Sequence, residues 1–171
     1  MAIVLGPING ANNCKYTMHI LDQLQSEGFR PVFSHYRNFK MVEDKKQVGD
    51  LDQKFNFVDF TSVEDVDLVI NHVHSRYPKA SIYLVGFSMG AIQAIRWVGE
   101  HKGQNKVKGL VSVSCPIDLS KASPHLSKPK HWVYARWMTG ALINIATYNE
   151  DLIRAKGFDV DFSRLCSARQ G

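Results

Sequence analysis

A serine flanked by glycines lies just past the middle of the chain, in the segment VGFSMGA at residues 85–91. A serine hydroxyl is a weak nucleophile until a base removes its proton. A sharp turn between a strand and a helix exposes such a serine, and glycines two residues to either side avoid a collision there. The pattern predicts that Ser88 is a catalytic nucleophile and that Gly86 and Gly90 are structural residues of its turn.

The other explanation of this segment is a glycine-rich turn that binds a phosphate. Such turns follow the patterns G-x-G-x-x-G or G-K-[ST], and the chain contains neither. We therefore favour ester chemistry, in which backbone amides must hold the oxyanion that forms when serine attacks a carbonyl. If a helix follows Ser88, the amide of Met89 is one such donor.

A second oxyanion donor is expected from the loop that follows an earlier strand. The candidate loop is LGPINGANN at residues 5–13. Pro7 has no amide hydrogen to donate, so the next residue, Ile8, is the predicted partner of Met89. The alternative is an ordinary glycine-rich turn at the end of a strand.

Apolar segments along the first two thirds of the chain predict strands separated by helices. The predicted strands are residues 2–5, 31–36, 81–85 and 109–114. Helices are predicted around residues 16–24, from Ser62 to Pro78, and after Ser88. Strands joined through helices form a mostly parallel α/β sheet covered on both faces.

The sequence also predicts a helix cap, a loop and a buried stripe within these elements. Ser62 is expected to cap the start of the second helix. Residues 38–60 are polar and weakly periodic, so a loop is expected there. In the helix after Ser88, the buried stripe is expected at Ala91, Ala94, Ile95 and Val98.

The pattern changes after Pro116. Residues 120–130 contain two prolines and are expected to be a loop. Residues 131–156 are expected to form one or two helices broken near Gly140, and no strand is predicted after Ser114. The chain is therefore divided into a core at residues 1–120 and a separate segment at residues 121–171.

Charge is unevenly distributed between these two parts. Residues 1–120 hold 13 basic and 12 acidic residues, whereas residues 121–171 hold 8 basic and 4 acidic residues. The excess is either a solvated basic tail or a contact with anionic lipid or another acidic surface. The basic residues are scattered and no zinc or RNA-binding motif is present, so nucleic acid is not expected as a partner.

Three cysteines, Cys14, Cys115 and Cys166, are far apart and show neither metal-ligand spacing nor a disulfide framework. They indicate a reducing compartment, and no metal or cofactor is predicted. The apolar segment after Met1 is too short for a signal peptide, and the uncharged residues 137–149 are too short to span a bilayer. We expect an intracellular protein, cytoplasmic or membrane-associated in a longer form.

Four segments, in order, resemble the α/β-hydrolase-domain-containing proteins of the type 1 and type 3 branch, which includes carboxylesterases and acylglycerol lipases. They are LGPINGA, HYRN, VGFSMGA and SVSCPIDL, which are similar to that family's oxyanion loop, N-Y-R-G, serine elbow and S-x-P-x-D-L motifs. A late stretch, FDVDFSRL, is a weaker match. The resemblance extends from Ala2 to about Leu165 and implies an α/β-hydrolase fold whose cap begins after residue 120.

The chain departs from the family pattern in two loops. Gly6-Pro7 reverses the family's Pro-Gly, and Asn38 replaces a glycine. In this fold the catalytic acid and histidine follow the serine in that order. The resemblance places both after two further strands, so we expect this chain to lack them and to begin at the family's third strand.

Residues of the chain could also replace the absent relay. His101 lies at the far end of the helix that Ser88 opens, roughly 20 Å away at 1.5 Å per residue. His125 and His131 lie near the start of the cap and are the remaining candidates, whereas His72 and His74 are expected on a helix surface. Asp118 matches a family aspartate and is expected to bond nearby backbone amides.

The resulting prediction is a serine hydrolase of carboxylic esters, with acyl lipids as the expected substrates. Trp132, Tyr134 and Trp137 would either line an acyl-chain entrance or pack within the cap. One alternative is a truncated, non-catalytic interaction module. The other is an acyltransferase or thioesterase that uses the same elbow, because a fold does not determine the reaction.

Overall fold

The computed structural model describes residues 1–8, 15–35, 63–102, 106–155 and 157–167. These residues form two compact units, Met1–Ile117 and Asp118–Gly171. The boundary lies close to the one expected at residue 120, and the role of the second unit as a cap remains a prediction. The loop expected at residues 38–60 lies outside the described residues.

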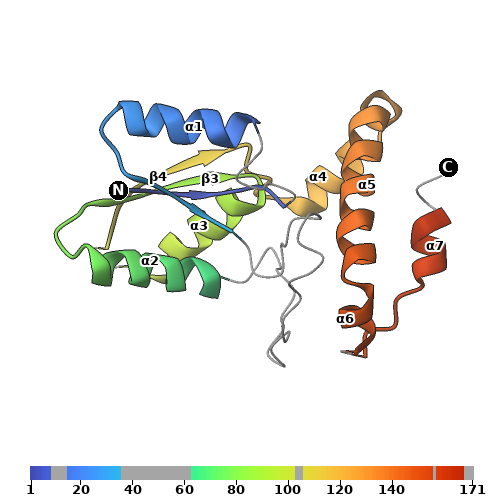
Figure 1. The fold of residues 1–171 in the computed structure, drawn as a ribbon. Helices are drawn as coiled ribbons and strands as arrows, with labels where there is room; N and C mark the ends of the chain where they lie inside the picture. Colours follow the sequence, from blue (N-terminus) through green and yellow to red (C-terminus); the bar gives the residue numbers. More distant parts are fainter. Residues whose placement is uncertain (9–14, 36–62, 103–105, 156, 168–171) are drawn as a thin grey trace. The chain divides into compact units, whose positions relative to one another are not determined.

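The first unit is built on a parallel sheet of four strands in the order β2-β1-β3-β4. Its strands are β1 (Ala2–Leu5), β2 (Pro31–Ser34), β3 (Ile82–Phe87) and β4 (Val107–Val113). Helix α1 (Lys15–Ser26) covers one face, and α2 (Glu64–Arg76) and α3 (Met89–Glu100) cover the other (Figure 1). This arrangement confirms the predicted α/β class.

The core lies on the face covered by α2 and α3. Alternate strand residues point to one face of a sheet, and here they meet the apolar stripe of α2. The buried cluster consists of Ile3, Leu5, Val66, Ile70, Val73, Ile82, Leu84, Ala94 and Trp97. Val66, Ile70 and Val73 are the buried residues of α2, and their spacing places them on one face of the helix.

The start of α2 differs from the prediction. Val63 occupies the N-cap position and no side chain caps the helix there; the predicted cap, Ser62, lies outside the described residues. Acidic residues in the first turn, including Glu64 and Asp67, stabilise the helix start through its dipole. The helix ends at Arg76, as expected from the following Pro78.

The buried face of α3 also differs from the expected stripe. Ala91 and Ala94 are fully buried, but Ile95 and Val98 are each 39% exposed. Trp97 is buried instead, at 1% exposure. Gly90, which lies against the backbone of β1, is at the centre of the buried arc, and Trp97 follows it by two helical turns. Because Gly90 contacts the backbone of β1, α3 buries the face that contains Gly90 and not the face predicted from the spacing of its apolar residues.

The second unit is helical throughout its described elements. It contains α4 (Leu119–Leu126), a short 3-10 helix (Pro129–His131), α5 (Trp132–Tyr148), α6 (Glu150–Ala155) and α7 (Phe162–Ser167). Two predictions were wrong here. The proline-containing loop forms α4, with Pro124 inside it, and α5 runs through Gly140 and ends at Tyr148.

Asp118 explains why α4 forms despite its proline. Its carboxylate accepts a hydrogen bond from the Lys121 amide at 3.1 Å and so caps the helix. The expectation that Asp118 bonds a nearby backbone amide is confirmed. Among the helices in the described part of the chain, none has the length and apolar character needed to cross a membrane.

Candidate active site

Ser88 is the single residue between strand β3 and helix α3. Its backbone has φ 52° and ψ −112°, in a region that residues other than glycine rarely occupy. The Ser88 amide donates to the Val113 carbonyl at 3.0 Å. The Ser88 carbonyl accepts from the amides of Ala91 and Ile92 at 3.1 and 3.2 Å. These bonds hold a strained turn in which the serine is half-buried.

Close backbone contacts exclude side chains at the two flanking glycines. A Cβ atom on Gly86 would lie 2.6 Å from the Gly90 carbonyl oxygen. A Cβ atom on Gly90 would lie 2.5 Å from the carbonyl oxygen of Leu5 and 2.6 Å from that of Gly6. The glycines therefore allow the strand, the turn and the loop after β1 to pack together.

The predicted oxyanion residues lie on elements that meet at this turn. Strand β1 pairs with β3 in the register Leu5↔Gly86, so the loop after β1 begins beside the elbow. Met89 is the first residue of α3, where helix amides have no partner within the helix. Ile8, half-buried, follows three residues after the end of β1. The pair of donors, Ile8 and Met89, remains a prediction.

A second serine also has a positive backbone φ. Ser114 has φ 51° and directly follows β4. Because Phe87 is paired with Val113, Ser88 and Ser114 follow equivalent positions of two neighbouring parallel strands. Ser114 was not predicted as a site residue, although a serine followed by Cys115 and Pro116 at a strand end indicates an abrupt turn.

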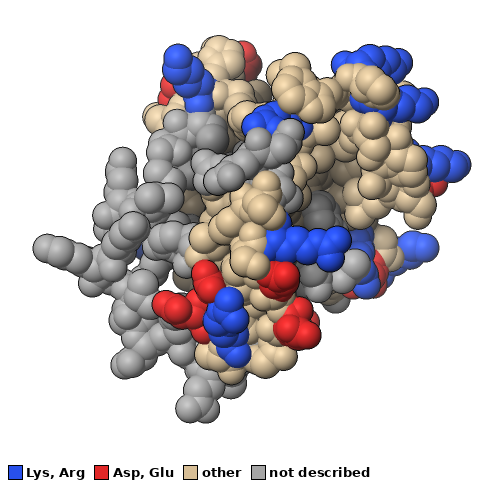
Figure 2. Space-filling model, turned by 90° about the vertical axis from the view of Figure 1, so that its right-hand side faces the viewer, with Lys and Arg blue, Asp and Glu red and all other residues tan. Residues whose placement is uncertain are grey.

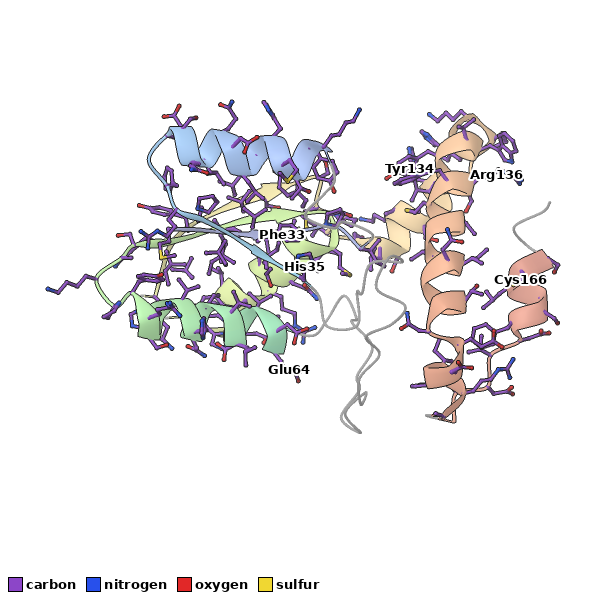
Figure 3. All side chains as sticks on the ribbon, viewed as in Figure 1. Phe33, His35, Glu64, Tyr134, Arg136 and Cys166 are labelled. Carbon is purple, nitrogen blue, oxygen red and sulfur yellow. The ribbon has the colours of Figure 1, made fainter. Side chains whose placement is uncertain are left out.

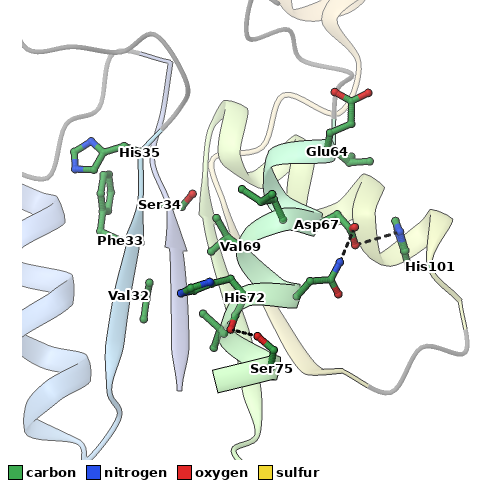
Figure 4. Close-up of a pocket in the computed structure, with 14 residues that line it drawn as sticks. Val32, Phe33, Ser34, His35, Glu64, Asp67, Val69, His72, Ser75 and His101 are labelled. Carbon is green, nitrogen blue, oxygen red and sulfur yellow. Dashed lines mark hydrogen bonds and ion pairs between the residues drawn. The ribbon is translucent and has the colours of Figure 1, made fainter. Parts of the chain in front are cut away.

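An open groove of about 1040 Å³ lies between β2 and α2, away from the elbow (Figure 4). Its walls include Phe33 and His35 from the end of β2, whose rings meet edge to face at 4.9 Å. His72 of α2, which is exposed on the helix surface as expected, also lines it. Ser88 is not among the lining residues, so the groove is not the predicted reaction site.

His101 has a structural role at the far end of α3. Its ring stacks on Trp97 at 4.5 Å, and its Nε2 lies 3.5 Å from Asp67 Oδ1. The same carboxylate oxygen accepts a hydrogen bond from Trp97 Nε1 at 3.0 Å. The contacts join α3 to α2, at the opposite end of the helix from Ser88.

His125 and His131 form a pair within the second unit. Their Nε2 atoms are 3.1 Å apart. Burial, followed by the positive charges of His125, Lys130 and Lys128, holds the pKa of His131 below its ordinary value of 6.5. Both histidines belong to the second unit and Ser88 belongs to the first, so their assignment as a base stays a prediction.

The described residues contain no group of three or more His, Cys, Asp or Glu side chains that could hold a metal ion. The features present are a parallel sheet with helices on both faces, and a serine in a strained turn between a strand and a helix. This combination defines the class of α/β hydrolases.

The particular family follows from sequence comparison. The profile of the family described as serine aminopeptidase, S33, matches residues 55–162, which is more than half of the chain. The chain therefore belongs to this family.

Curated relatives agree with the resemblance seen in the motifs. The chain is 23% identical to Phospholipase ABHD3 of Bos taurus over 93% of its own length and 37% of the relative. It is 29% identical to Embryogenesis-associated protein EMB8 of Picea glauca over 74% of the chain and 26% of the relative. A shorter match, 34% identical over 32% of the chain, covers 12% of a Saccharomyces cerevisiae monoacylglycerol lipase.

These matches confirm a lipase-like branch of the α/β hydrolases. The chain spans about a third of the length of the first of these relatives. No solved structure matches the chain significantly.

Proposed function

We propose that the chain carries the nucleophile and the oxyanion-binding amides of a serine hydrolase that cleaves carboxylic esters of acyl lipids. The observation that carries this proposal is the backbone of Ser88, which is held at φ 52° between β3 and α3 by hydrogen bonds on both sides. Strained residues of this kind cluster at active sites, where the surrounding structure holds them. The names of two relatives, a phospholipase and a monoacylglycerol lipase, support lipid esters as the substrate class.

In the proposed reaction, Ser88 Oγ attacks the ester carbonyl carbon and its proton passes to a base. The carbonyl oxygen becomes negative in the tetrahedral intermediate, where the amides of Met89 and Ile8 stabilise it. The base then donates that proton to the leaving alkoxide oxygen as its bond to the carbonyl carbon breaks, which leaves an acyl-enzyme and a free alcohol. Water then attacks the acyl-enzyme, releases the fatty acid and restores the serine hydroxyl. We assign the base and its acidic partner to residues outside these 171, in keeping with the serine-acid-histidine order of the fold.

The test compares alanine variants of two serines. They are made in the longest natural protein that contains this sequence, because the relatives are longer than the chain. We expect Ser88→Ala to abolish labelling by a fluorophosphonate probe, since loss of a triad serine costs on the order of 10⁶ in kcat. Ser114→Ala is the matched control, because Ser114 has nearly the same φ and directly follows the neighbouring strand. It should label normally. Persistent labelling of Ser88→Ala would place the nucleophile elsewhere.

The oxyanion assignment is tested by Ile8→Pro, which deletes one amide donor without adding charge. Losing such a donor costs about 3 kcal/mol of transition-state stabilisation, or 10² to 10³ in kcat. We expect that loss with little change in KM on a nitrophenyl ester. An unchanged kcat would show that another amide holds the oxyanion.

A further inference from the structure

The first turns of α5 carry large apolar side chains that face solvent. Trp132, Val133, Tyr134 and Trp137 are 58%, 73%, 54% and 59% exposed. Large exposed apolar groups that are contiguous, rather than scattered, mark an interaction surface. Together with three nearby basic residues they define the aromatic–basic patch: Lys128, Lys130, Trp132, Val133, Tyr134, Arg136 and Trp137.

The side chains of this patch are organised by contacts with one another. The Arg136 guanidinium lies over the Trp132 ring, 5.6 Å from its centre. The rings of Tyr134 and Trp137 are 6.1 Å apart. Tyr134 and Arg136 project from opposite sides of the helix (Figure 3), so the patch wraps around the start of α5.

The positive charge of the second unit is concentrated at the same place. Residues 118–137 hold four basic residues and one acidic residue, whereas residues 150–171 hold four of each. The acidic residue is Asp118, which caps α4 and lies 3.4 Å from Lys121. Lys128 and Lys130 are exposed beside the aromatic residues. Figure 2 shows one face of the molecule with its lysine and arginine side chains in blue and its aspartate and glutamate side chains in red.

We propose that the aromatic–basic patch docks on the surface of an anionic lipid bilayer. Tryptophan and tyrosine favour the membrane interface, where their rings enter the acyl boundary and their polar atoms meet headgroups. Lysine and arginine beside them are attracted to anionic headgroups. This combination of exposed indole rings and excess positive charge matches a lipid surface better than a protein interface core, from which lysine is usually depleted. The proposal concerns docking and does not depend on reaction at Ser88.

The experiment is flotation of the 171-residue chain with vesicles of phosphatidylcholine containing phosphatidylserine, beside vesicles of phosphatidylcholine alone. Bound protein rises with the vesicles, whereas self-associated protein sinks. We expect flotation with the anionic vesicles that is lost at high salt, because surface attraction is screened. Lipids brominated in the acyl chain should quench the fluorescence of Trp132 and Trp137 and spare the buried Trp97.

Two pairs of variants locate the contact. Lys128→Gln/Lys130→Gln should reduce vesicle partitioning about thirtyfold, at about 1 kcal/mol per lysine, and Trp132→Ser/Trp137→Ser should reduce flotation with the anionic vesicles. Lys79→Gln/Lys108→Gln makes the same charge change at exposed lysines outside the patch, and Leu68→Ser/Phe158→Ser removes exposed apolar groups elsewhere. These controls, and Ser88→Ala, should float like the unmodified chain.

The proposal is overturned if the chain fails to float, if it floats equally with uncharged vesicles, or if the patch variants behave as their controls do. Retention by a single-stranded oligonucleotide without flotation would assign the patch to nucleic acid and would also overturn it. Loss of fluorophosphonate labelling, in contrast, bears only on the proposed catalytic function.

Discussion

Ser88 and Ser114 have nearly the same backbone φ, yet only Ser88 is followed directly by a helix. The amides of α3 therefore begin beside the Ser88 hydroxyl, where an oxyanion would form. Ser114 instead leads into a short turn closed by a hydrogen bond from the Ile117 amide to the Cys115 carbonyl at 3.0 Å. At the scale of single residues, the helix start distinguishes the proposed nucleophile, Ser88, from the neighbouring Ser114.

The histidine pair of the second unit supplies a pH-dependent prediction. Because the pKa of His131 is lowered by burial and by the charges of His125, Lys130 and Lys128, the folded unit binds this proton less tightly than the unfolded chain does. Its contribution to the free energy of unfolding is therefore intact above pH 6.5, the ordinary pKa. That contribution falls as the pH drops from there through the lowered value.

His125→Asn removes one of the charges that lower the pKa of His131. We expect NMR titration of the imidazole protons to show a higher pKa for His131 and a smaller loss of stability in acid. His19→Asn, an exposed change on α1, should leave His131 unaltered. A pKa of His131 that is identical in the His125→Asn variant would contradict the assigned electrostatic cause.

At the scale of elements, two glycines in the same helix have opposite surroundings. A Cβ atom on Gly90 would collide with the backbone oxygens of Leu5 and Gly6, whereas a Cβ atom on Gly99 meets nothing within 4 Å. The collision at Gly90 is with backbone and cannot be relieved by a side-chain rotation. Gly90 therefore allows the close approach of α3 to β1, whereas Gly99 only lowers the stability of the helix.

We expect Gly90→Ala to lower the free energy of unfolding by about 1 to 3 kcal/mol, as overpacking does. Gly99→Ala should raise it by about 1 kcal/mol or less, because alanine favours the helix. Urea denaturation followed by circular dichroism measures both. Equal effects of the two substitutions would show that α3 is not seated against β1 as described.

At the scale of the whole molecule, the sheet formed by the described residues has two outer strands, β2 and β4. Val111 of β4 is 56% exposed and points to the same face as its partner Val85. An apolar edge strand with unpaired backbone groups invites pairing with another chain. No charge lies between Gly109 and Val113 to oppose such pairing. We therefore expect the isolated 171-residue chain to self-associate.

Val111→Lys should reduce this self-association, because a charged side chain on an edge strand opposes pairing. Size-exclusion chromatography with light scattering would show a shift toward the monomer. Ile117→Lys is the matched control, since Ile117 is 85% exposed but lies beyond the strand. If both substitutions shift the distribution equally, general solubility rather than edge pairing is responsible.

The sequence by itself determined the α/β class, the strands and the motif around Ser88. Each depends on local patterns, such as the apolar segment before Ser88 and the helical spacing of Val66, Ile70 and Val73. These local patterns agree with the fold because a helix or strand buries one face, and the residues on that face recur with the period of the element.

The tertiary structure decided features that depend on contact between distant segments. Approach of β1 to Gly90 buried Trp97 and left Ile95 and Val98 partly exposed. Pairing of β3 with β4 placed Ser114 beside Ser88. The burial of Trp97 and the position of Ser114 cannot be predicted from the local spacing of residues. The apolar stripe of a helix does not specify which strand will contact a glycine of that helix.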